Sequence, residues 1–92
     1  MQRGFRVTGR VQGVYFRVWT QGLAEDLGLR GTVFNCRDGS VEAHVQGPQQ
    51  QVAAFEARLW DGPPASKVEG VEQVDSTAEL PAAPFRILPT VR

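Results

Sequence analysis

The chain has 92 residues, of which 41% are hydrophobic and 22% are charged, and this length fits one domain with a modest core. Its formal net charge is zero, which argues against a nucleic-acid binder that relies on a broad positive field. No apolar stretch approaches the ~20 residues that span a bilayer, and the first residues lack the apolar core of a signal peptide. We therefore expect one domain over residues 1–92 that is cytoplasmic and monomeric, with no membrane or nucleic-acid partner.

Cysteine content and charge distribution narrow the chemistry further. Cys36 is the only cysteine, so the chain can form no internal disulfide and no zinc cluster of thiolates. Residues 1–37 hold six arginines against two carboxylates, whereas the remainder holds four basic and eight acidic groups. Solvated surface explains most of these charges individually, but the asymmetry also favours local attraction of a small anion.

The first part of the chain predicts a strand, a helix and a second strand. An alternating pattern places Phe5 and Val7 on the buried face of a strand that ends at Gly9. A helical stripe then starts at Phe16, and Gly28 is well placed to end the helix. The members of the stripe are Phe16, Thr20, Leu23, Ala24 and Leu27. A second strand is expected over residues 29–35.

The middle of the chain predicts a hairpin and a second helix. Asp38-Gly39 is typical of a tight turn, and a third strand follows over residues 41–46. Its core face carries Val41, Ala43 and Val45, whereas Glu42, His44 and Gln46 are expected on a wetter face. Gly47-Pro48 opens the next helix with proline in the first turn. The apolar stripe of that helix is Val52, Phe55 and Leu59.

The last part of the chain has a weaker pattern. Residues 68–77 predict a fourth strand with a bulge or an irregular start, because its valines are spaced by three. Residues 85–88 predict a short fifth strand at an edge of the sheet. The order βαββαβ indicates an α+β fold, the ferredoxin-like split βαβ sandwich, with both helices on one face of an antiparallel sheet.

The segment from Gly9 to Arg17 joins the first strand to the first helix. Its two glycines, Gly9 and Gly13, allow the backbone to approach a ligand, and unpaired N–H groups at the helix start attract anions. Arg17, in the first helical turn, offers a planar donor that matches phosphate oxygens. The glycines could equally just bound a strand-to-helix connection. Nucleotide-binding glycine patterns are absent from the segment.

Strand order brings a second residue to this segment. In a split βαβ unit the first two strands run parallel, since the crossover helix returns the chain to its starting end. The first strand ends at Gly9 and the second near Asn35, so both ends lie at the edge of the sheet where the helix begins. We expect Asn35 and Arg17 to meet there.

These residues resemble the acylphosphatase family. The likeness covers nearly the whole chain and is carried by the segment Gly9–Arg17, by Asn35 and by residues 38–42. The resemblance implies a ferredoxin-like fold and hydrolysis of the carboxyl–phosphate bond of a small-molecule acyl phosphate, with no metal and no cofactor. It makes Arg17 the phosphate-binding arginine and Asn35 the residue that positions the attacking water. It also assigns a phosphate-binding cradle to Arg10, Val11, Gln12, Gly13, Val14, Tyr15 and Phe16.

Several other residues are weighed against this site. His44 is interpreted as a solvated or packing histidine, and a nucleophilic role is not expected of Cys36 because no histidine is nearby in the sequence. Thr20 could help to fix Asn35 or a group of the loop. Four aromatic residues could border the acyl group, with packing as the default interpretation of each. They are Tyr15, Trp19, Phe34 and Trp60.

Two other functional classes stay open. A non-catalytic anion-binding module could keep the fold and the loop, although binding alone needs no water-orienting amide such as Asn35. An RNA-binding domain could share this topology, and Arg3-Gly4-Phe5 faintly resembles one of its motifs. That motif belongs on the third strand with stacking aromatics, whereas here it lies on the first.

Overall fold

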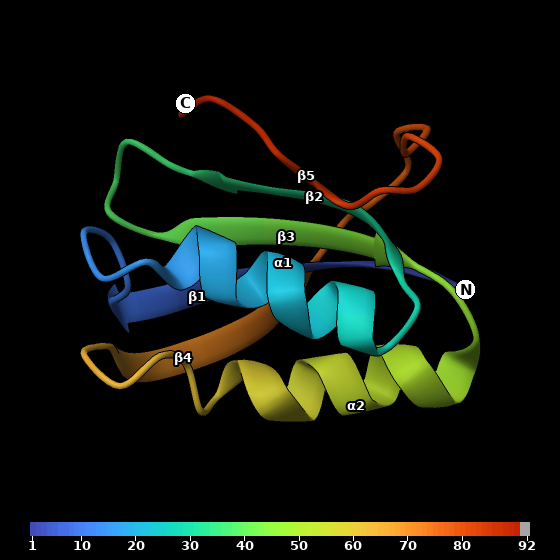
Figure 1. Cartoon of the computed structure of the whole chain (residues 1–92). Coiled ribbons are helices and arrows are strands. Elements are labelled where there is room, and N and C mark those ends of the chain that lie inside the picture. The colour runs from blue at the N-terminus through green and yellow to red at the C-terminus, as the bar shows by residue number, and fades with distance from the viewer. Residues whose placement is uncertain (91–92) are drawn as a thin grey trace.

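A computed structural model describes residues 1–90 and contains five strands and two helices in the described part of the chain (Figure 1). In chain order they are β1 (Gln2–Arg10), α1 (Phe16–Asp26), β2 (Arg30–Asn35), β3 (Val41–Gln46), α2 (Gln49–Leu59), β4 (Lys67–Val74) and β5 (Arg86–Ile87). One sheet holds the strands in the order β4-β1-β3-β2-β5. The predicted βαββαβ order and the short fifth edge strand are confirmed.

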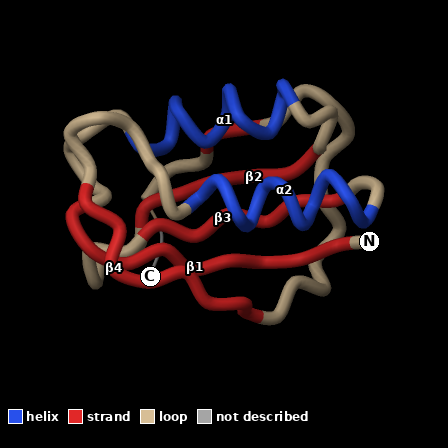
Figure 2. The backbone as a smooth tube through the Cα atoms, turned by 90° about the horizontal axis from the view of Figure 1, so that it is seen from below, coloured by secondary structure: helices blue, strands red, loops and turns tan. Residues whose placement is uncertain are grey.

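Strand pairing explains how the ends of β1 and β2 meet. β3 pairs antiparallel with both β1 and β2, so those two strands run parallel with β3 between them. β5 pairs parallel with β2, which makes the sheet mostly rather than wholly antiparallel. Both helices cover the same face of the sheet (Figures 1 and 2). In residues 1–90 neither helix has the length and apolarity needed to cross a lipid bilayer.

The core lies between the helices and the sheet, and it follows the apolar periods of the sequence. The buried side chains of α1 are Phe16, Thr20, Leu23 and Ala24, and those of α2 are Val52, Phe55 and Leu59. The strands contribute their alternating residues, and the rings of Phe5 and Phe55 lie 5.9 Å apart between their centroids. Burial of these apolar surfaces is the main stabilising term of such a fold.

The helix ends agree with the predicted signals to within a residue. α1 begins at Phe16, and Gly28 follows its end with a φ of +70°, which favours glycine. The N–H of Gly28 donates to the carbonyl of Glu25 at 3.0 Å, and this bond closes the last turn. Pro48 precedes α2 as its N-cap, one residue before the predicted first-turn position.

The face of the sheet opposite the helices is not the wet face that the pattern of β3 predicts. Glu42 is only 2% exposed, and its Oε1 lies 2.9 Å from Nε2 of His44. The chain after β4 returns over part of this face, next to His44. Ser76 Oγ lies 2.8 Å from Nδ1 of His44, and Leu80 is buried. The alternation identified the two faces of β3, but it could not reveal this cover.

Gly9 marks an irregularity between β1 and β4. The register of the two strands shifts between Thr8 and Gly9, so the predicted irregular pairing of β4 is confirmed. Gly9 has a φ of +116°, and a Cβ there would lie 2.2 Å from the carbonyl oxygen of Lys67. The close approach of the β4 backbone therefore requires glycine at position 9, independently of any ligand.

Candidate active site

A pocket of about 450 Å³ opens where α1 begins, at the edge of the sheet where β1 and β2 end. The chain segments that border it are the β1–α1 loop, the first turn of α1, the end of β2 and the edge strand β5. Its lining residues are Val11, Gly13, Tyr15, Phe16, Arg17, Val18, Asn35 and Ile87. The structure thus brings together Arg17 and Asn35, as the parallel course of the first two strands predicts.

Left-handed backbone conformations shape the loop in front of the helix. Gly13 has a φ of +75°, and a Cβ built there would meet no atom within 4 Å. Tyr15 adopts the left-handed conformation with a φ of 65°, which is uncommon for a residue other than glycine. Its side chain is 83% exposed, so core packing does not explain this conformation. Strained backbone of this kind is often found at functional sites.

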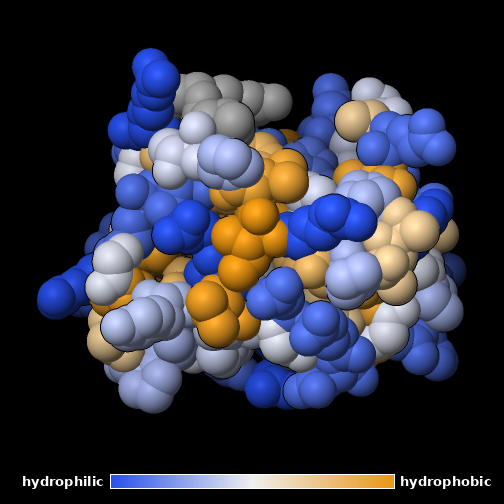
Figure 3. Space-filling model, turned by 45° about the horizontal axis from the view of Figure 1, so that its top comes forward, coloured by the Kyte–Doolittle hydropathy of each residue, from blue (hydrophilic) through white to orange (hydrophobic). Residues whose placement is uncertain are grey.

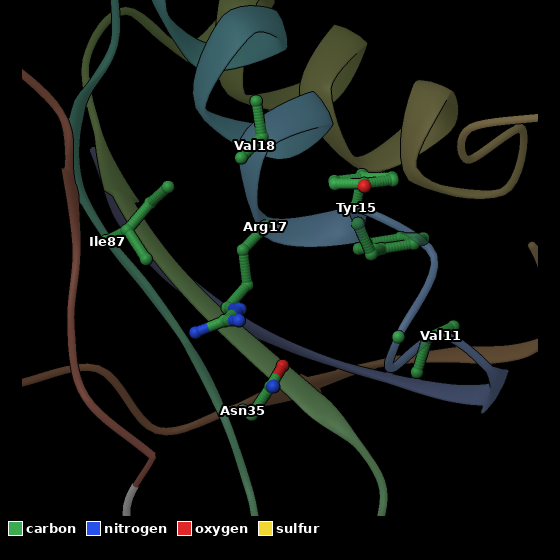
Figure 4. A pocket seen from close by; sticks show the side chains of 8 residues that line it. Val11, Tyr15, Arg17, Val18, Asn35 and Ile87 are labelled. Atoms are coloured by element: carbon green, nitrogen blue, oxygen red, sulfur yellow. The ribbon is translucent and has the colours of Figure 1, made fainter.

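The N-terminus of α1 offers unpaired donors to the pocket. Tyr15 is the N-cap, makes no side-chain capping hydrogen bond, and is followed by no acidic residue in the first turn. The first N–H groups of a helix have no partner within it, and the helix dipole adds partial positive charge. Arg17 projects from the same turn into the pocket (Figure 4). The positive end of the pocket therefore combines a guanidinium with an uncapped helix.

Asn35 supplies the second polar group of the pocket. Figure 4 shows its carboxamide directed toward the guanidinium of Arg17. Its Oδ1 is buried, yet accepts no hydrogen bond from any residue in the described part of the chain. A buried acceptor without a partner is costly, so such an atom in a pocket indicates a site for water or ligand.

Gln12 has a role that the sequence did not reveal. Its Nε2 donates to the carbonyl oxygens of Cys36 and Ser40, at 2.7 and 2.9 Å. Those carbonyls belong to the β2–β3 connection that directly follows Asn35. The Gln12 side chain therefore points away from the pocket and fixes the loop relative to the strand that carries Asn35.

The β2–β3 connection is itself held by a short hydrogen-bond network. Asp38 Oδ1 accepts from the hydroxyl of Ser40 at 2.6 Å and from its backbone N–H at 2.9 Å. These bonds, first the hydroxyl and then the N–H, hold the pKa of the Asp38 carboxyl below its ordinary value, and Arg6 at 3.9 Å adds a smaller effect. Gln12 therefore binds to a turn with a defined shape.

Other residues proposed for the site lie elsewhere. Arg10, Gln12 and Val14 do not line the pocket, and the Val14 side chain belongs to the core. The prediction that Thr20 fixes Asn35 is wrong, because its buried hydroxyl has no hydrogen-bond partner among residues 1–90. His44 lies outside the pocket, bonded to Glu42 and Ser76.

Of the four aromatic residues that could border an acyl group, only Tyr15 lines the pocket. Trp19 packs on Phe16 with ring centroids 5.5 Å apart, and Phe34 stacks on His44 on the other face of the sheet. Val18 and Ile87 line the pocket instead, and sequence reasoning missed both. The sequence did contain a signal for Val18, because it is an apolar residue that lies outside the buried stripe of its helix.

Comparison with known proteins agrees with this geometry. The family model described as acylphosphatase matches residues 3–87 of the chain. The chain belongs to the acylphosphatase family. It is 51% identical over 83 residues to a protein named acylphosphatase from Rhizobium meliloti, and the match covers 89% of this chain and 86% of the relative. It is 49% identical to an acylphosphatase from Sinorhizobium medicae, with 89% and 87% covered.

A solved member of the acylphosphatase family has the same fold. The crystal structure of acylphosphatase from Bacillus subtilis matches with a TM-score of 0.86 at 36% identity, covering 95% of this chain and 97% of that one. The predicted acylphosphatase family and the predicted ferredoxin-like fold are thereby confirmed. In the described residues, no group of three or more His, Cys, Asp or Glu side chains is placed to hold a metal ion.

Proposed function

We propose that this chain hydrolyses acyl phosphates to a carboxylate and inorganic phosphate, with Arg17 binding the phosphate and Asn35 orienting the attacking water. The observation that carries the proposal is the meeting of three features in one pocket. These are the guanidinium of Arg17, the uncapped start of α1, and the Oδ1 of Asn35, which accepts no hydrogen bond from residues 1–90. Membership of the acylphosphatase family supports the reaction class.

The proposed phosphate position is against the loop and the helix start. The N–H groups of the first helical turn and the two-pronged guanidinium of Arg17 would share the charge on the phosphoryl oxygens. Such fixed donors stabilise charge that develops in the transition state without rearranging during the reaction. Among the residues predicted for the cradle, Val11, Gly13, Tyr15 and Phe16 line the pocket and support this position.

Asn35 would act on the water. Its Oδ1 can accept a hydrogen bond from a water molecule and hold it for in-line attack on phosphorus. The new P–O bond forms as the bond to the carboxylate oxygen breaks, and the carboxylate leaves as a stable anion. The two protons of the water end on the phosphate product, so the leaving group needs no proton.

The proposed reaction does not require a strong general base. Among the described residues that line the pocket there is no His, Asp, Glu, Lys or Cys that could serve as a general base. An acyl phosphate is already activated as a mixed anhydride, so positioning and charge stabilisation can supply most of the rate. This match between reaction and lining supports an activated phosphate as the substrate.

Hydrolysis of benzoyl phosphate by the purified protein, with a chelator present, tests the proposal. We expect Asn35→Ala to lower kcat on the order of 100-fold while phosphate still inhibits. Arg17→Ala should lower kcat/KM on the order of 1000-fold and abolish inhibition by phosphate. An inactive wild-type protein that binds phosphate tightly would instead favour an anion-binding module. Full activity in both variants would contradict the proposed roles of Arg17 and Asn35.

A further inference from the structure

The pocket has two chemically different sides. Arg17 and Asn35 form the polar side, where phosphate is proposed to bind. The other side is apolar, because Val18 of α1 and Ile87 of β5 line the same pocket. In Figure 4, Ile87 and Val11 lie on opposite sides of the Arg17 side chain, so the edge strand that carries Ile87 lies across the guanidinium from the loop. A ligand held by Arg17 can therefore extend over Val18 and Ile87.

We propose that Val18 and Ile87 form the acyl subsite, and that the preferred substrates are acyl phosphates with an apolar, uncharged acyl group. This inference rests on the proposed function and adds the substrate class. It concerns the half of the substrate that leaves as the carboxylate.

The first support is the exposure of apolar side chains at this place. Val18 is 58% exposed and lies outside the buried stripe of α1. A single exposed apolar residue is ordinary, but Ile87 joins it from a distant part of the sequence. Figure 3 shows apolar side chains gathered in the middle of the face that it draws, with hydrophilic ones around them. Exposed apolar side chains that share a pocket with polar groups, as Val18 and Ile87 do, are typical of ligand binding.

The second support is that the apolar side is fixed before any ligand binds. Ile87 is paired with Val33 of β2, and the N–H of Leu88 donates to the carbonyl of Val33 at 2.9 Å. Phe85 is buried in the core, and its carbonyl accepts from Nε2 of Gln21 on α1 at 2.9 Å. β5 is therefore anchored both to the sheet and to the helix that carries Val18. A preformed surface loses little entropy when it binds.

The third support is charge. Arg17 is the only Lys, Arg, Asp or Glu among the described residues that line the pocket. If Arg17 holds the phosphate, no second cation of the lining is left for another anionic group. A carboxylate or second phosphate on the acyl group would lie against Val18 and Ile87 and lose hydration without a partner. The geometry therefore disfavours acyl groups that carry their own negative charge.

The test compares substrates in the wild-type protein and in a Val18→Thr/Ile87→Thr double variant. Threonine nearly matches the shape of valine, so Val18→Thr replaces a methyl by a hydroxyl. Ile87→Thr keeps the β-branch and replaces the ethyl group of isoleucine by a hydroxyl. The measured quantity is kcat/KM for benzoyl phosphate divided by kcat/KM for acetyl phosphate. Leaving-group reactivity cancels when this ratio is compared between proteins. The control is Trp60→Ser, because Trp60 is 51% exposed and lies outside the pocket.

We expect the double variant to lower the ratio about tenfold, which is the low end of the discrimination that a hydrophobic pocket gives per methylene. Trp60→Ser should leave the ratio unchanged. The inhibition constants of benzylphosphonate and methylphosphonate should shift in the same sense, and that measurement is independent of chemistry. Wild-type protein should also prefer butyryl phosphate to succinyl phosphate, which ends in a carboxylate.

An unchanged ratio in the double variant, with acetyl phosphate still hydrolysed by the wild-type protein, would overturn the subsite and leave the proposed function standing. Equal use of butyryl and succinyl phosphates would overturn the charge part of the inference. If the wild-type protein hydrolyses none of these substrates, the proposed function itself falls, and the substrate class falls with it.

Discussion

Replacing Gln12 by alanine removes the connection between the loop and the strand that carries Asn35. Two hydrogen bonds are lost, of 2.7 Å to the Cys36 carbonyl and 2.9 Å to the Ser40 carbonyl. A typical hydrogen bond contributes about 1 kcal/mol net. Both carbonyls keep a backbone donor, from Gly39 at 3.1 Å and from Cys36 at 2.8 Å, so neither is left unpaired. We expect the free energy of unfolding to fall by about 1–2 kcal/mol.

The same change should reduce turnover, because the β1–α1 loop is no longer held in a fixed position relative to Asn35. A small misplacement of catalytic groups can cost up to about 100-fold in rate, and we expect a loss of kcat/KM of about tenfold or more. Stability is measured by urea unfolding followed by tryptophan fluorescence, and activity with benzoyl phosphate.

Gln2→Ala provides a matched control for this prediction. The Nε2 of Gln2 also donates to backbone carbonyls, those of Ser76 and Ala78, but Gln2 does not line the pocket. It should lose stability of similar size and keep wild-type kcat/KM. The positioning role of Gln12 would be refuted if Gln12→Ala lost stability but kept full activity, as Gln2→Ala is expected to do.

Three further predictions concern the glycines and the β2–β3 turn. Gly9→Ala should destabilise the protein strongly, because its Cβ would meet the Lys67 carbonyl at 2.2 Å. Gly13→Ala should cost about 1–2 kcal/mol of backbone strain and mainly lower kcat/KM. Equal urea unfolding midpoints for the two variants would contradict this. Gly22→Ala, exposed in α1 with open space around it, should stabilise by about 1 kcal/mol in urea unfolding at unchanged activity, and a loss of stability would be the contrary result. Asp38 has a lowered pKa when folded, so its stabilising contribution should be constant above about pH 4 and lost as pH falls through the folded pKa. The difference in urea midpoint between wild type and Asp38→Ala should narrow below that pH, and a constant difference down to pH 2 would argue against the effect.

The fold was predictable where the apolar pattern within a single helix or strand determines which of its faces is buried. The stripe of α2, Val52, Phe55 and Leu59, is buried as predicted, and β3 has the predicted bounds. The burial of Glu42 was not predictable, because the alternation of β3 places it on the face that was expected to be wet, and its contacts with His44 and Cys36 depend on the folded structure.

The candidate site was predictable where topology decides position. Arg17 and Asn35 share a pocket because β1 and β2 are parallel and end at one edge of the sheet. The role of Gln12 was not predictable, since its partners are backbone carbonyls, which any sequence would offer. The two glycines of the loop also looked equivalent in the sequence. Gly9 is required by the backbone of β4, whereas Gly13 lines the pocket and faces open space.

Hydrolysis of benzoyl phosphate in oxygen-18 water tests most directly whether water attacks phosphorus at the Arg17–Asn35 site. Mass spectrometry of the two products shows which of them takes up the label. The proposed mechanism predicts that the label enters inorganic phosphate in the enzyme-catalysed reaction and that benzoate stays unlabelled. Label in benzoate would mean attack at the carbonyl carbon, and it would contradict the proposed roles of both residues.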